Sequence, residues 1–240
     1  MKHLPLIILV VLSGLNGFSQ KGSTHFGLQY RPIVPNRIIG TFEQEFNKDQ
    51  FFSTVRQKYG NNLGMIIRVG LSDRISLETG ISFTQRNFDL HFSVPDSGYT
   101  ANNDVRLISY EVPLSGLFFI RLGEQVYMNA ALGAALTIFP SDIRTYTEIN
   151  AKGALFQQEG AYRSKVQGAA LANLGVEYRT KSKGYWYFGA SYHQPFSPII
   201  TFAMSYEYES GNVVAIDNIL GSYLTIDLRY YFNEKKDKKK

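Results

Sequence analysis

The sequence predicts an all-β protein built as an eight-stranded antiparallel transmembrane β-barrel, with ten strands as an alternative count. Two observations predict this fold. Apolar side chains recur at every second position in one segment after another, and the connections between these segments are alternately short and long. Alternation with period two places successive side chains on opposite faces of a strand, and short turns alternating with long loops are typical of barrels in bacterial outer membranes.

Eight segments carry the alternation. The clearest pair flanks residues 72–74, where residues 63–71 and 75–83 place aliphatic or aromatic side chains, and Thr79, at odd positions. The other predicted strands lie around residues 26–30, 108–120, 126–136, 166–178, 186–192 and 224–232. Short turns are then expected at 72–74, 121–125 and 180–184, and external loops at 35–59, 93–105, 139–162 and 194–218. Both chain ends fall on the side of the short turns.

The two faces of these strands differ in charge. One face is almost wholly apolar, and a charged side chain facing lipid near the bilayer centre costs roughly 2–4 kcal/mol, so the charged face is expected to line the lumen. Buried charges persist when they are paired, which predicts a network of ion pairs that plugs the barrel. Its predicted members are Arg31, Arg68, Glu78, Arg86, Glu111, Glu177, Asp227 and Arg229.

Small residues share the charged face. An eight-stranded barrel has an interior only just wide enough for its side chains, so glycines there either make room for long arginines or help the sheet to curl. The glycines concerned are Gly27, Gly64, Gly70, Gly80, Gly133, Gly175 and Gly189.

The chain divides into three parts. Residues 1–19 combine a basic start, an apolar run and small residues before Gln20, the pattern of a secretory signal peptide. Residues 20–232 form the predicted barrel, and residues 233–240 form a charged tail on the periplasmic side. This tail contributes +3 and Lys2 contributes +1 to the formal net charge of +5, so the remainder is nearly neutral and nucleic acid is not an expected partner.

The predicted strands resemble the outer-membrane β-barrel families of Bacteroidetes-type bacteria, a broad group that includes PorT-like proteins. The resemblance rests on the segment SYEVPL at 109–114, with support from LQYRPIVP at 28–35, GVEYR at 175–179 and LRYYF at 228–232. It implies that the barrel-assembly machinery recognises the aromatic end of the last strand, which here carries Tyr230 and Phe232. It also implies a place in the bacterial outer membrane, in contact with lipid and lipopolysaccharide.

The sequence offers no catalytic centre. His25, His91 and His193 lie far apart near predicted strand ends, without the serine and the acid that a lipid hydrolase would need. Acidic pairs such as Glu43 and Glu45 are interpreted as solvated carboxylates, so no metal and no cofactor is expected. We therefore expect a non-enzymatic, closed barrel whose external loops serve envelope structure or bind an unknown protein partner. The alternatives are an accessory of a secretion or gliding apparatus, as in PorT-like proteins, and a narrow small-solute channel.

Overall fold

The computed structural model describes residues 23–35, 43–48, 51–95, 98–140, 149–151, 154–180, 183–208 and 211–233. These residues form antiparallel strands and their connections, with no α-helix among them. Within this part of the chain, no helix is long and apolar enough to cross a membrane. The predicted signal peptide and the tail beyond Asn233 lie outside the described residues.

Eight strands close into a ring. They are β1 (Thr24–Val34), β3 (Phe51–Gly70), β4 (Ile75–Val94), β5 (Tyr99–Arg121), β6 (Val126–Ile138), β9 (Val166–Arg179), β10 (Tyr185–Pro195) and β13 (Tyr223–Tyr231). The order around the ring is β1-β13-β10-β9-β6-β5-β4-β3, and β3 pairs back onto β1, with Phe26 opposite Ile67. Closure pairs every strand on both sides and so leaves no open edge in the ring. The predicted eight-stranded antiparallel barrel is confirmed.

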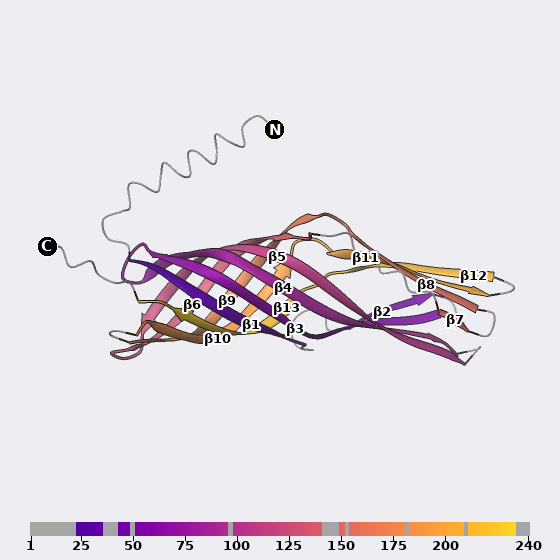
Figure 1. The fold of residues 1–240 in the computed structure, drawn as a ribbon, viewed down its shortest axis with the longest axis horizontal. Helices are drawn as coiled ribbons and strands as arrows, with labels where there is room; N and C mark the ends of the chain where they lie inside the picture. The colour runs from indigo at the N-terminus through magenta and orange to yellow at the C-terminus, as the bar shows by residue number, and fades with distance from the viewer. Residues whose placement is uncertain are drawn as a thin grey trace, which may run out of the picture.

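Three short turns lie at one end of the ring, at residues 71–74, 122–125 and around 180–184. The described ends of the chain lie there too, since the Phe232 N–H donates to the Phe26 carbonyl at 2.8 Å. Figure 1 shows this end of the barrel on the left and a long, narrowing extension on the right. The predicted short turns are therefore found at the end of the ring where the first and last ring strands begin and end.

The extension consists of strands that continue past the ring. β1 follows β3 only up to Gly60, and β6 follows β5 only from Tyr110 onward, so the far halves of β3, β4 and β5 project beyond their ring neighbours. β2 (Glu43–Lys48) pairs with the end of β3. A second sheet with the order β12-β11-β8-β7 completes the extension, and Figure 1 shows it alongside them. Its strands are β7 (Ile149–Ala151), β8 (Ala154–Tyr162), β11 (Ile200–Tyr208) and β12 (Gly211–Ile219).

The prediction that 35–59, 93–105, 139–162 and 194–218 are loops between strands is therefore wrong for most of the described residues in those segments. The interval 93–105 holds the ends of β4 and β5 around a tight turn that includes Gly98, and much of 35–59, 139–162 and 194–218 is strand. Backbone N–H and C=O groups need partners, and the second sheet supplies them where the ring no longer does. The extension also has an apolar core, which irregular loops would lack.

The strand β4 shows why sequence reasoning missed the extension. Between Ile75 and Phe83 its apolar side chains lie at odd positions and face outward, while Ser76, Glu78 and Ser82 are buried. Beyond Arg86 the pattern inverts, because Phe88, Leu90, Phe92 and Val94 are buried and the outward positions 85–93 are polar. The protein thus has an apolar exterior around a polar interior in the ring, and the reverse arrangement in the extension.

Candidate functional site in the barrel interior

The ring interior is filled by charged and polar side chains from all around the wall. All eight predicted residues point inward, and each is less than 9% exposed. They fall into two groups. One group lies nearer the short turns and centres on Glu78, and the other lies nearer the extension and centres on Glu111.

Glu78 on β4 joins strands that are not neighbours in the ring. Its Oε2 accepts hydrogen bonds from Arg68 Nη2 at 3.1 Å and from the Tyr231 hydroxyl at 2.5 Å. Its Oε1 accepts one from Arg229 Nη1 at 2.5 Å, which reaches across the lumen from β13. The Arg68 guanidinium also lies 3.8 Å from the centre of the Tyr231 ring, a cation–π contact. This one carboxylate therefore ties β3, β4 and β13 together.

A second carboxylate, Glu177 on β9, continues the group. It forms an ion pair with Arg68 and accepts a hydrogen bond from Arg179 Nε at 2.5 Å. The Arg179 guanidinium lies 4.1 Å from the ring centre of Tyr127 and 4.8 Å from that of Phe119. Sequence reasoning missed Arg179, although its position two residues after Glu177 puts it on the same face of the strand.

Asp227 on β13 is held by four donors. Arg229 Nη2 lies 2.6 Å from Oδ2, and the Ser191 hydroxyl donates to the same oxygen at 2.5 Å. Asn173 Nδ2 donates to Oδ2 at 3.0 Å, while the Thr225 hydroxyl donates to Oδ1 at 2.6 Å. Donors in this number offset the cost of burying the carboxylate.

Glu111 on β5 is the centre of the group that lies nearer the extension. The Tyr223 hydroxyl donates to its Oε1 at 2.7 Å, while Arg31 Nη2 lies 3.8 Å from Oε2. His193 Nε2 lies 3.9 Å from Oε1, and the His193 ring stacks on Tyr223 with centroids 4.5 Å apart. Arg31 is also anchored by Asn62, whose Oδ1 accepts from Arg31 Nε at 3.0 Å. His193 thus points into the barrel interior, where it lies beside Glu111 and Tyr223.

Arg86 differs from the other predicted members. It makes no ion pair with any described residue, and its Nη1 donates to the Gly221 carbonyl at 2.8 Å. Its guanidinium lies 5.4 Å from the centre of the Tyr223 ring. Gly221 has φ of +71°, a conformation that favours glycine. Arg86 therefore marks the border between the charged interior and the apolar core of the extension, and the expected acidic partner is replaced there by a backbone carbonyl.

Two interior glycines make room for an aromatic ring. Gly175 on β9 and Gly189 on β10 lie directly opposite each other. A methyl group on either one would collide with the Tyr187 hydroxyl. Tyr187 donates to Asn173 Oδ1 at 2.7 Å, and Arg229 lies 4.8 Å from its ring centre. The sequence suggests that the glycines either make room for long arginines or help the sheet to curl, and this pair fits the first explanation. The side chain that occupies the space is Tyr187, and the arginine packs against the Tyr187 ring.

Little empty space remains inside the ring. A cavity of about 20 Å³ lies between the two groups, beside Gln29, Arg31 and Glu78, which is on the order of the space that one water molecule occupies. At the short-turn end, an open hollow of about 1180 Å³ reaches inward as far as Arg68 and Phe119. These two spaces are separated by the charged side chains of the group around Glu78, since Arg68 lines the hollow and Glu78 lines the cavity.

The extension is filled by apolar residues. Leu90, Ile200, Phe202 and Met204 are almost fully buried in one cluster between the two sheets. Tyr162 stacks on Phe139 with ring centroids 4.2 Å apart, and burial raises the pKa of Tyr162 to about 12. Other members of the cluster are Val55, Phe88, Phe92, Val94, Val105, Leu107, Ile199, Tyr206, Ala215 and Ile219.

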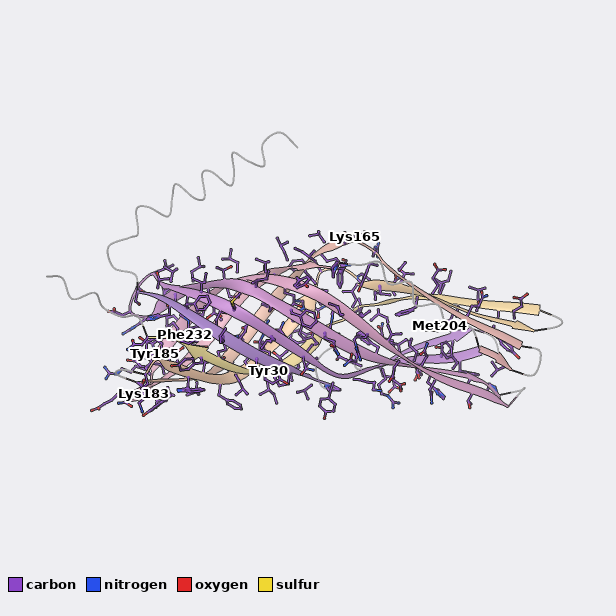
Figure 2. All side chains as sticks on the ribbon, in the orientation of Figure 1. Tyr30, Lys165, Lys183, Tyr185, Met204 and Phe232 are labelled. Atoms are coloured by element: carbon purple, nitrogen blue, oxygen red, sulfur yellow. The ribbon has the colours of Figure 1, made fainter. Side chains whose placement is uncertain are left out.

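The predicted assembly residues Tyr230 and Phe232 lie on the outer wall at the short-turn end. Phe232 stacks on Phe26 of β1 with centroids 6.0 Å apart, and Tyr230 lies 4.7 Å from Trp186. Figure 2 shows Phe232, Tyr185 and Lys183 gathered at this end, far from Met204 in the extension. Aromatic side chains in such a band are typical of the interface between a membrane and water.

The histidines that could serve a metal or a catalytic site lie apart from one another in the described part of the chain. Within the described ranges, no three His, Asp or Glu side chains are placed to hold a metal ion. His25 stacks edge-on against Tyr185 at 4.8 Å, and His91 Nδ1 lies 2.5 Å from Asn102 Oδ1, far from His193 along the strands. The three histidines therefore remain apart, as their sequence positions indicate.

Comparisons with known proteins give weak likenesses. No protein-family model matches the sequence, and no curated protein matches it. Among solved structures, the outer membrane protein OprG from Pseudomonas aeruginosa aligns over 88% of this chain and 97% of its own, with 12% identity and a TM-score of 0.49. Outer membrane protein AlkL aligns over 89% of this chain and 92% of its own, with 12% identity and a TM-score of 0.37.

The translocator domain of autotransporter NalP from Neisseria meningitidis aligns over 96% of this chain and 95% of its own, with 8% identity and a TM-score of 0.33. Similarities of this size add no support to the fold, which rests on the closed ring of strand pairings described above.

Proposed function

We propose that this protein is a closed, non-enzymatic barrel of the bacterial outer membrane that holds a rigid β-extension outside the cell. The apolar exterior of the ring supports the membrane placement. On β4 the outward apolar row runs from Ile75 to Phe83, a span of the length that a tilted strand needs to cross the hydrocarbon core. On the extension side of this row, the outward positions 85–93 of β4 are polar and suit contact with water.

The observation that carries the closed state is the filling of the interior at two levels. Paired charges around Glu78 and Glu111 occupy the ring, and the apolar cluster around Leu90 and Phe202 occupies the extension. Neither level leaves a continuous path for solutes. The wall is therefore a scaffold, and contacts with a protein partner belong to the extension and its tips.

Conductance tests the closed state directly. The full chain, refolded and inserted into a planar bilayer, is expected to give no stable conductance. The double variant Glu78→Ser with Arg229→Ser, which removes two long side chains from the ring, is expected to stay closed because the apolar cluster is untouched. A stable, large conductance of the unaltered chain would contradict the proposal. The electrophoretic shift of folded barrels on heating verifies insertion in both cases.

A further inference from the structure

We propose that the outer wall carries a binding site for the phosphorylated headgroup of lipid A, at the level where the apolar belt ends. This inference rests on the membrane placement proposed above. The site centres on Arg106 of β5 and Lys58 of β3, which the strand register puts in one row with Asn87 of β4 between them.

The height of this row on the barrel identifies the kind of ligand. Two steps toward the ring along the same faces, Leu63, Phe83 and Tyr110 form an apolar row, with Phe83 and Tyr110 in edge-to-face contact at 6.0 Å. One step farther from the ring along the same strands, Asp89 of β4 lies opposite Asp104 of β5, and both acids suit contact with water. The row with Arg106 and Lys58 thus lies where acyl chains give way to headgroups, which in the outer leaflet belong to lipopolysaccharide.

An irregularity in the strand widens the site. The pairing of β3 with β4 shifts between Lys58 and Asn61, so that both Lys58 and Tyr59 are exposed on the outer wall. Tyr59 is 72% exposed, and a bulge of this kind often redirects a side chain in this way. A tyrosine at this height presents an apolar ring to lipid and a hydroxyl to the headgroup layer.

A hollow lies against these residues. It measures about 910 Å³, within the range of small-molecule sites. Its lining residues are Pro35, Gln57, Lys58, Tyr59, Asn87, Asp104, Val105 and Arg106. Its volume suits a sugar headgroup, and the strand register places the apolar row of Leu63, Phe83 and Tyr110 on the membrane side of it.

The charges within the hollow favour a phosphate at Arg106. Lys58 Nζ is already bound by both carboxylate oxygens of Asp104, at 2.9 and 3.0 Å. Asn87 Nδ2 is used by the Tyr59 carbonyl at 2.6 Å. Arg106 is exposed and makes no side-chain hydrogen bond or ion pair with the rest of the described chain. A guanidinium with open donors binds a phosphate through two parallel hydrogen bonds.

The test measures lipid A bound to the purified full chain in detergent, by native mass spectrometry. The probes are bis-phosphorylated lipid A, lipid A stripped of both phosphates, and inorganic phosphate alone. The unaltered chain is expected to bind the phosphorylated lipid at least tenfold more tightly than the stripped one. Arg106→Gln combined with Lys58→Gln is expected to abolish that preference. Arg121→Gln, at the opposite end of β5, is the matched control and is expected to keep it.

Three outcomes would overturn the site. These are equal binding of phosphorylated and stripped lipid A, an unchanged preference in the double variant, and displacement of the lipid by inorganic phosphate at comparable concentration. Insertion of the same samples into vesicles is measured in parallel. A chain that inserts but shows no phosphate preference refutes this site alone, whereas a chain that fails to insert refutes the membrane placement.

Discussion

At the scale of single residues, the structure depends on carboxylates that serve several cations at once. Glu78 accepts from Arg68, Arg229 and Tyr231, and no other described acid reaches both arginines. Such an arrangement is costly to assemble but more costly to break, because removing one partner leaves charges that are buried and uncompensated.

We predict that Glu78→Gln destabilises the barrel by about 3–5 kcal/mol, the usual cost of breaking a buried ion pair from one side. Urea unfolding of the refolded protein in detergent, followed by the electrophoretic shift of the folded form, measures the change. Glu124→Gln in an exposed short turn is the control and is expected to leave the unfolding midpoint in place. Equal midpoints for the Glu78 variant and the unaltered protein would mean that the network adds nothing to stability.

The sequence predicts which residues enter the interior but not how they pair. Strand parity alone directs the charged side chains inward, and it also covers Arg179, which was overlooked. The partners depend on how the strands are staggered around the ring. Arg229 of β13 meets Glu78 of β4 across the lumen, and nothing in the spacing of these residues indicates that contact. For the same reason Arg86 could not be assigned to the Gly221 carbonyl.

At the scale of elements, the extension is the feature that sequence reasoning missed. The outward apolar row that predicts a strand ends at Phe83 on β4. The next apolar residue on the strand is Phe88, which lies on the other face. A second row that begins with inverted parity therefore looked like loop sequence, although Phe88, Leu90, Phe92 and Val94 repeat with period two.

We predict that Phe202→Ala loosens the extension without unfolding the ring. Phe202 is 1% exposed at the centre of the apolar cluster, and truncation of a buried phenylalanine costs about 3–5 kcal/mol. Limited proteolysis of the protein in vesicles is expected to cut the extension of the variant sooner while the ring strands stay protected. Ile216→Ala in the same sheet is the control, because Ile216 is 66% exposed. Equal cleavage rates for the two variants would show that the cluster does not hold the sheets together.

At the scale of the whole molecule, one inversion of the apolar and polar faces supports both the proposed membrane placement and the proposed closed interior. A barrel in water would bury its apolar residues along its full length. Here the ring exposes them and the extension buries them, on the same strands. Exposed apolar surface of this extent is typical of contact with a membrane or another apolar surface, so our proposal places the membrane surface at the level of the inversion.

The length and closure of the ring were predictable from the sequence, because they depend on local alternation and on the short turns. The inversion was not predictable from alternation alone, since the same alternation fits an apolar outer face along the whole strand. The ring and the extension can both be predicted from the sequence if the exterior is apolar on the ring side of the bulge at Lys58 and aqueous on the extension side.

The most direct test of the inversion uses the absence of cysteine from the chain. Single substitutions Leu114→Cys and Asn102→Cys place a nitroxide label on the outer face of β5, below and above the proposed membrane surface, and both side chains are exposed. After insertion into vesicles, collisions with dissolved oxygen and with a water-soluble nickel chelate are measured. Contact of the label at 114 mainly with oxygen and of the label at 102 mainly with nickel is the predicted result. Equal access of nickel to both labels would contradict the account.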